Sequence, residues 1–241
     1  MLRLIDAGDT ISVKSCDYYS KKVESYYRAY GTAYDFCHFY SNGCGGYILI
    51  YNSLAVICGD GFEDEELSEF LRVFSPASVE LPLSIFNRID AEQYSAKPRT
   101  MFRMAALPSQ NREKLHINDD FPLAFSILCE GFPLTADEYP QWYTDLSHRI
   151  RHGSAALYTY GSHSTATLQF SIDGFAFVSH IATDSKERGK GYAREMLSEI
   201  AAIFDNSDTI GHLWALEHRT SYYSSIGFEP VDNDILLEMD E

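Results

Sequence analysis

Two basic residues and two glycines stand together in the stretch Arg188-Gly189-Lys190-Gly191. The stretch lies between an apolar run at 174–183, which predicts a strand, and an amphipathic pattern from Ala193 onward, which predicts a helix. The first turn of a helix has N–H groups without carbonyl partners and carries the positive end of the helix dipole. Glycines let the backbone approach a ligand closely. These residues therefore predict a turn that binds an anion such as a pyrophosphate.

Two common phosphate-binding sequences are absent from this turn. No third glycine follows Gly191 at the Rossmann spacing, and no Ser or Thr follows Lys190 as in a Walker loop. The residues present, Arg188-x-x-Gly191-x-Ala193, resemble the acyl-CoA motif [Q/R]-x-x-G-x-[G/A] of the GNAT N-acetyltransferase superfamily. Taken alone, the same residues also fit an ordinary basic helix N-terminus after a glycine turn.

A second motif supports the resemblance. Tyr223-x-x-x-Gly227-Phe228 is similar to the Y-x-x-x-G-F sequence that closes the GNAT fold. Between the two motifs the sequence predicts a helix and then a strand at 210–216, in the order that the family has. The residues around the motifs most resemble the branch that includes glycine N-acyltransferase-like proteins.

The resemblance implies a fold, a cosubstrate and an activity. The fold is the GNAT fold of the α/β (α+β) class, in which helices flank a mixed, mostly antiparallel sheet. The activity is direct transfer of an acetyl group from acetyl-CoA to a primary amine of a small molecule or peptide. The alternative is a regulatory or interaction module that binds acyl-CoA without turnover. The residues expected to bind the cofactor are His180, Ile181, Ala182, Arg188, Gly189, Lys190, Gly191, Tyr192 and Ala193.

Acyl transfer from a thioester to an amine needs hydrogen-bond donors for the oxyanion and a proton for the departing thiolate. The resemblance places the donors on the backbone around His180 to Ala182 and the proton on Tyr223. The alternative for Tyr223 is core packing before a turn. Its neighbour Tyr222 is expected to pack into the core.

The general base is less well defined by the sequence. The positions where several GNAT enzymes carry Glu or His hold Phe177 and Ser179 here. His180 is out of phase by strand alternation unless a bulge rotates it inward, and it is a candidate base or proton relay. Glu217, at the end of the strand predicted at 210–216, is the other candidate. A water chain, or an acceptor that binds already neutral, also remains open.

Composition narrows the choice of partners. The formal net charge of −16 over 241 residues disfavours nucleic acid and anionic membranes as partners and fits a cationic amine. No apolar run approaches the roughly 18 residues of a membrane span, and the N-terminus lacks the apolar core of a signal peptide. The oligomeric state is left open, a dimer being one option.

The cysteines indicate a reducing compartment. They are five in number and contain no C-x-x-C pair, which favours a cytoplasmic protein. Cys37-His38 and Cys44 fit no standard zinc spacing, so no metal site is expected.

Two regions are predicted. The GNAT domain comprises 99–241, with strands at 100–107, 155–160, 165–171, 174–183 and 210–216, helices at 121–131, 135–152 and from Ala193, a short helix through Tyr222, and a last strand or hairpin at 228–239. The region 1–98 is expected to be a non-catalytic α/β region, with a helix at 18–30, strands at 46–51 and 54–58, and a helix at 63–74. We expect it to be a degenerate half-copy of the fold, bounded by Lys97-Pro98-Arg99.

Overall fold

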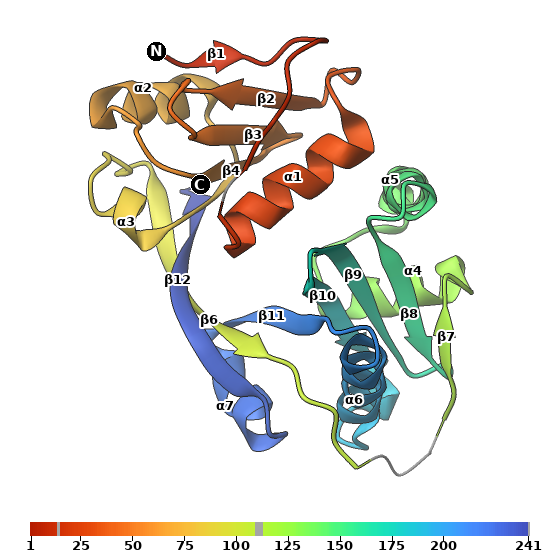
Figure 1. Ribbon diagram of the computed structural model, residues 1–241. Helices are drawn as coiled ribbons and strands as arrows, with labels where there is room; N and C mark the ends of the chain where they lie inside the picture. Colours follow the sequence, from red (N-terminus) through yellow and green to blue (C-terminus); the bar gives the residue numbers. More distant parts are fainter. Residues whose placement is uncertain (14, 109–112, 241) are drawn as a thin grey trace. The chain divides into compact units, whose positions relative to one another are not determined.

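The computed structural model describes residues 1–13, 15–108 and 113–240 (Figure 1). The chain divides into two compact units, which we describe separately. The first comprises Met1–Thr100 and Asn233–Glu241, and the second comprises Met101–Asp232. The chain passes between them within two strands, β6 (Tyr94–Arg103) and β12 (Glu229–Met239).

The predicted boundary at Lys97-Pro98-Arg99 falls inside β6, and the first strand of the second region begins at Tyr94 rather than at Thr100. Proline disrupts a helix, but a strand accepts it where its missing N–H would have had no ladder partner. The return of the chain to the first unit after Asp232 was not predicted. Residues 109–112, between the strand predicted at 100–107 and the helix predicted at 121–131, lie outside the described residues.

The first unit contains a sheet in the order β1-β2-β3-β4-β5-β12. The strands β1 (Arg3–Leu4), β2 (Cys37–Ser41), β3 (Tyr47–Tyr51) and β4 (Leu54–Cys58) pair antiparallel in sequence order. β5 (Ser78–Leu81) then runs parallel to β4, and β12 pairs antiparallel with β5. The short helix α3 (Leu83–Phe86) follows β5.

Two longer helices cover opposite faces of this sheet (Figure 1). α2 (Asp64–Phe74) buries Leu67 and Leu71 against Ile48 and Ile57. α1 (Tyr18–Tyr30) begins at the N-cap Asp17, whose carboxylate accepts a hydrogen bond from the Ser20 N–H, and it lies against β3 and β4. Their extents agree closely with the helices predicted at 18–30 and 63–74.

The second unit has the sheet order β6-β11-β10-β9-β8-β7. β7 (Leu115–Ile117), β8 (Ala156–Tyr160), β9 (Ser164–Ile172) and β10 (Phe175–Thr183) pair antiparallel, and β11 (Ile210–Leu216) runs parallel to β10. The strands predicted at 155–160, 165–171, 174–183 and 210–216 are confirmed as β8, β9, β10 and β11, whereas β7 was not predicted.

Helices lie on both faces of this sheet. α6 (Tyr192–Asp205) buries Met196, Leu197, Ile200 and Ala201 in one cluster with Val178 and other residues of the strands. The other face is covered by α4 (Phe121–Gly131) and α5 (Tyr139–Arg151), and α5 follows the short 3₁₀ turn η1 (Ala136–Glu138). α7 (Glu217–Ser225) follows β11 directly, and the predicted last strand is the single strand β12.

The two units share an order of elements. In each, three antiparallel strands lead through a helix to a fourth strand that is parallel to the third: β2-β3-β4-α2-β5 and β8-β9-β10-α6-β11. That the first region is a half-copy of the same fold stays a prediction.

Candidate active site

The turn before α6 leaves the first backbone N–H groups of the helix accessible. Gly189 and Gly191 have φ angles of +78° and +87°, a region that suits glycine, and Gly191 is the N-cap of α6. Because Gly191 has no side chain, no side-chain cap satisfies these N–H groups. A 14-residue helix with an uncapped start can bind an anion.

Arg188 anchors this turn. Its Nε donates to the Thr183 carbonyl at 3.2 Å, and its Nη2 donates to the Glu130 carbonyl near the C-terminal end of α4 at 3.0 Å. The Glu130 carboxylate in turn accepts a hydrogen bond from the Ser185 N–H at 2.6 Å, at the start of η2 (Ser185–Glu187). The end of β10, the turn and α4 are thus tied together through one side chain.

Lys190 is exposed, and its Nζ lies 2.9 Å from a carboxylate oxygen of Glu187. The hydrogen bond to Glu187 raises the pKa of Lys190. The same Glu187 oxygen lies 3.6 Å from Nδ1 of His163, whose ring stacks on Tyr192 at 4.1 Å. An anion bound at this turn would therefore compete with Glu187 for Lys190.

β10 and β11 separate just before this turn. Their parallel pairing covers Phe175 to Phe177 on β10 and Ile210 to His212 on β11, and no later pair joins the described parts of the two strands. β10 continues to Thr183 and β11 to Leu216. The strands therefore separate toward the end at which α6 begins.

The divergent part of β10 contains a bulge. The register with β9 shifts between Ser179 and Ala182, so that His180 and Ile181 lie outside the regular ladder. His180 has a φ of +49°, which is uncommon for a residue with a side chain. Ala182 is buried and Ile181 is half-buried.

The bulge determines where the His180 imidazole lies. The Gln169 amide nitrogen is 3.2 Å from His180 Nδ1 and donates to the Ser179 hydroxyl at 2.8 Å. The side chains of Ser179 and His180 therefore lie on the same face of β10, although successive residues of a regular strand point to opposite faces. The exposed imidazole also meets the edge of the Phe132 ring, with a centroid separation of 5.7 Å.

Tyr223 lies in α7 and is only 8% exposed. Its ring packs in the core with Phe102 and Phe228, with centroids 5.6 and 6.2 Å away. Burial raises the pKa of its phenol. The expectation that Tyr222 packs into the core was wrong, because Tyr222 is 38% exposed; successive helix residues point about 100° apart.

Glu217 is the first residue of α7, directly after β11, and it is exposed. A carboxylate in the first turn of a helix stabilises that helix through the macrodipole. The Glu217 backbone carbonyl accepts a hydrogen bond from the Thr220 hydroxyl at 2.9 Å.

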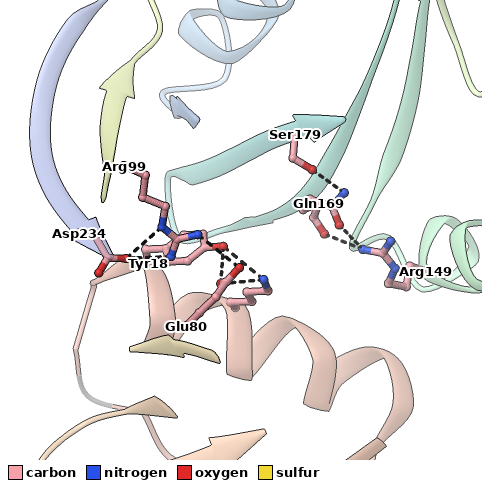
Figure 2. Close-up of polar contacts among 8 residues, drawn as sticks. Tyr18, Glu80, Arg99, Arg149, Gln169, Ser179 and Asp234 are labelled. Atoms are coloured by element: carbon pink, nitrogen blue, oxygen red, sulfur yellow. Dashed lines mark hydrogen bonds and ion pairs between the residues drawn. The ribbon is translucent and has the colours of Figure 1, made fainter. Parts of the chain in front are cut away.

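Two buried polar residues near the bulge were not predicted: Gln169, which contacts Ser179 and His180, and Arg149, which contacts Gln169. Figure 2 shows both with Ser179. Arg149 of α5 donates through Nη1 to Gln169 Oε1 at 2.9 Å, and its Nη2 forms an ion pair with Asp145 at 3.0 Å. Arg149 is 5% exposed and Gln169 is 8% exposed. The sequence contained one signal for this contact: Gln169 is a long polar residue in β9, whose other residues are mostly apolar or carry hydroxyl groups.

The described residues contain no group of three or more His, Cys, Asp or Glu side chains arranged to hold a metal ion. In the same part of the chain, no helix combines the length and the apolar character needed to cross a membrane.

The structure was compared with known proteins. No protein-family model matches the sequence, and no curated protein matches it at a significant level. The fold is similar to that of a GNAT-family acetyltransferase from Colwellia psychrerythraea, with a TM-score of 0.56, 11% identity and 100% of each chain covered. It is also similar to a GCN5-related N-acetyltransferase-like protein from Streptococcus suis, with a TM-score of 0.56, 10% identity and 92% and 99% of this and that chain covered.

A third structure, a GCN5-related N-acetyltransferase from Sphaerobacter thermophilus, has a TM-score of 0.55 at 14% identity and covers 89% of this chain and 84% of its own. At such identities the agreement concerns the path of the backbone, and it extends over both units. Together with the glycine turn before α6 and the divergence of β10 from β11, it shows that this chain has the GNAT fold.

Proposed function

We propose that this protein is an N-acyltransferase of the GNAT superfamily that transfers an acetyl group from acetyl-CoA to a primary amine of a small molecule or peptide. The observation that carries the proposal is the uncapped, glycine-initiated N-terminus of α6, at the end where β10 and β11 diverge. The N–H groups at the start of α6 would bind a diphosphate, and the pantetheine arm would extend toward the separated ends of β10 and β11.

The cofactor would be held mainly by backbone. The N–H groups of Gly189 to Ala193 would receive the diphosphate, with Lys190 contributing charge once it leaves Glu187. Arg188 would keep the turn in place through Thr183 and Glu130. The bulge residues His180, Ile181 and Ala182 would supply backbone donors to the thioester.

The reaction would run by direct attack. The amine nitrogen uses its lone pair to form a bond with the thioester carbonyl carbon, and the carbon–sulfur bond breaks with its electron pair on sulfur. The thiolate takes a proton from the Tyr223 phenol, and Tyr223 is then reprotonated by solvent. The proton that the amine loses passes to water. The net charge of −16 favours a cationic acceptor in the encounter.

A second candidate is a module that binds acyl-CoA without turnover. Two observations favour it: Phe177 and Ser179 occupy positions where several GNAT enzymes carry a base, and Glu217 is an exposed carboxylate at a helix start. The retained tyrosine at Tyr223 favours turnover.

Thermal unfolding with and without acetyl-CoA, followed by release of free thiol in the presence of an amine panel, separates these possibilities. We expect acetyl-CoA to raise the unfolding temperature and at least one amine to accelerate thiol release. Stabilisation without release by any amine would favour the binding module. No stabilisation at millimolar acetyl-CoA would contradict both.

A further inference from the structure

The contacts around Gln169 determine which way its amide points. Arg149 carries only hydrogen-bond donors, so the Gln169 atom 2.9 Å from its Nη1 has to be the carbonyl oxygen. The amide nitrogen then faces Ser179 and His180, at 2.8 and 3.2 Å. Its two hydrogens match these two acceptors, one each.

The orientation of the amide in turn determines the state of the imidazole. Because Gln169 donates to Nδ1 of His180, that nitrogen has to present its lone pair. In a neutral imidazole the proton is then on Nε2. A proton on Nδ1 would point at the hydrogen of the Gln169 amide. The lone pair that a general base would need on Nε2 is therefore absent.

Arg149 is itself held in place. Its Nε and Nη2 lie 3.1 and 3.0 Å from the same Asp145 oxygen, and its Nη1 also lies 3.3 Å from the Gln169 backbone carbonyl. Arg149 and Gln169 are 5% and 8% exposed, so turning the amide over would leave a buried guanidinium facing an NH₂ group (Figure 2). The network Asp145–Arg149–Gln169 therefore resists the alternative arrangement.

We infer that Arg149 and Gln169 are positioning residues that hold His180 as the neutral Nε2–H tautomer, so that His180 serves the acyl transfer as a hydrogen-bond donor and not as the base. This inference rests on the proposed function. His180 stands on the bulge of β10, where that strand has left β11. From there Nε2–H is suited to bind an oxygen, either the developing oxyanion of the thioester or a carbonyl of the acceptor.

The role of His180 as a donor bears on the choice of acceptor. If His180 does not take the proton of the amine, the attacking nitrogen has to arrive neutral or lose its proton to water. We therefore expect amines of low pKa to be better acceptors than strongly basic alkylamines, when the two are compared at neutral pH.

The tautomer can be measured without any enzymatic assay. Two-bond ¹⁵N–¹H correlation spectra of the full chain, with His180 assigned through its loss in His180→Gln, distinguish a protonated Nε2 from a protonated Nδ1. We expect Nε2–H in the wild-type protein. In Gln169→Glu the new carboxylate keeps a partner for Arg149 but accepts a hydrogen bond from His180, so we expect Nδ1 to become protonated. The matched control is Gln141→Leu, an exposed glutamine of α5, which should leave the spectrum unchanged.

The role of His180 is tested by two substitutions at that position. Glutamine places an N–H donor close to where Nε2 lies but supplies no base, whereas alanine supplies neither. We expect kcat to fall about 10²-fold in His180→Ala and to stay within about 10-fold of wild type in His180→Gln. Gln169→Leu should also lower kcat about 10-fold with little change in the affinity for acetyl-CoA, because the donor would be misplaced.

These outcomes separate this inference from the proposed function. An active enzyme in which His180 is protonated on Nδ1, or in which His180→Gln loses as much activity as His180→Ala, would overturn the inference and leave the function standing. An Nε2–H signal in a protein that acetylates no amine would confirm the positioning by Gln169 but overturn the role in catalysis, together with the proposed function.

Discussion

Tyr223 shows what burial does to a proposed acid. Desolvation disfavours the phenolate, so the pKa of Tyr223 lies above its ordinary value of about 10. The phenol therefore keeps its proton up to at least about pH 10, and it would be in its donating form throughout the neutral range. A phenol held in this way gives up its proton late, after most of the charge has collected on sulfur.

The first prediction concerns Tyr223→Phe. The substitution keeps the ring and its packing against Phe102 and Phe228 but removes the proton donor. We expect kcat and kcat/KM to fall together by about 10²-fold, with acetyl-CoA affinity unchanged, because the interaction is made only in the transition state. Steady-state kinetics of thiol release and calorimetry of acetyl-CoA binding measure both quantities.

Tyr222→Phe is the matched control for this prediction, since Tyr222 is the exposed neighbour on the same helix. It should turn over at the wild-type rate. Wild-type turnover by Tyr223→Phe would instead make Tyr223 a packing residue only. If the turnover rate of the wild-type protein falls as the pH rises toward 10, the same fall should appear in Tyr223→Phe, because Tyr223 ionises only at a higher pH.

Single site residues could be predicted from the sequence where they belong to a local motif, but not where they meet a residue of another element. The positions of Arg188 to Ala193 and of Tyr223 follow from motifs of six residues each. The pair Arg149–Gln169 joins residues 20 positions apart, on a helix and a strand. Nothing in the periodicity of either element indicates that contact, and the turned side chain of His180 depends on a bulge that alternation does not predict.

Two helices of the protein, α2 and α6, both follow a pair of glycines, but their first turns carry different charges. Gly59 and Gly61 precede α2 with φ angles of +78° and +77°, close to those of Gly189 and Gly191 before α6. The first turn of α2, however, contains Asp64, Glu65 and Glu66. These carboxylates already complement the dipole of α2 and repel an anion. A Cβ at Gly59 would also lie 2.2 Å from the Gly45 carbonyl oxygen, so that turn is closely packed.

The second prediction follows from this contrast. We expect calorimetry to find one acetyl-CoA per chain, bound at the turn before α6 and not at the turn before α2. Gly191→Val should abolish this binding, because a branched side chain would occupy the path of the diphosphate and disfavour the positive φ. Gly153→Val changes a positive-φ glycine away from the turn and controls for strain alone. Two bound molecules per chain, or equal affinity in Gly191→Val, would contradict the assignment.

The elements themselves were predictable to the extent that their patterns are local. β10, α6 and β11 follow from an apolar run, a 3.6-residue period and a second apolar run, and their extents agree with the prediction to within a residue or so. β2, β5 and β7 were not predicted because polar residues interrupt their apolar ones, whereas β3 and β4, which are no longer than β2, are nearly continuous apolar runs. The start of β6 was predicted too late, because Pro98 indicated a boundary although the chain remains extended there.

At the scale of the whole chain, buried charges join segments that are far apart in sequence (Figure 2). Glu80 of β5 accepts hydrogen bonds from Tyr18 and Lys22 at 2.8 Å each, and it lies 3.4 Å from Arg99. Arg99 also pairs with Asp234 of β12, 135 positions away, at 2.8 Å. All lie in the first unit, so this cluster connects its sheet to the segment that arrives last.

The third prediction concerns Glu80→Gln. Burial alone would raise the pKa of Glu80, but Lys22 and Arg99 outweigh it and lower the pKa to about 2 from 4.5. Removing the carboxylate leaves two buried cations with one buried anion, Asp234. We expect the free energy of unfolding at pH 7 to fall by about 3–5 kcal/mol in urea titrations. Glu92→Gln, an exposed carboxylate of the same unit, should cost little.

The pH dependence has a definite sign. The pKa of Glu80 is lower in the folded state than in the unfolded state. The contribution of its carboxylate to the free energy of unfolding is therefore fully present above pH 4.5 and is lost as the pH falls from 4.5 toward 2. Burial raises the pKa of Asp234, which acts in the opposite direction. The difference in the free energy of unfolding between the wild-type protein and Glu80→Gln should therefore decrease as the pH falls, by about 3 kcal/mol in total. A difference that is constant between pH 7 and pH 3 would contradict this.

The path of β12 has a consequence for how the protein is made. The first unit consists of residues 1–100 and 233–241, so β5 lacks its partner strand β12, and Arg99 lacks Asp234, until the whole second unit has been synthesised. During synthesis the second unit has all of its own residues before the first unit does, although it begins a hundred residues later. A stalled or shortened chain that ends before β12 would leave β5 with an open edge, which could pair with the β12 segment of another copy.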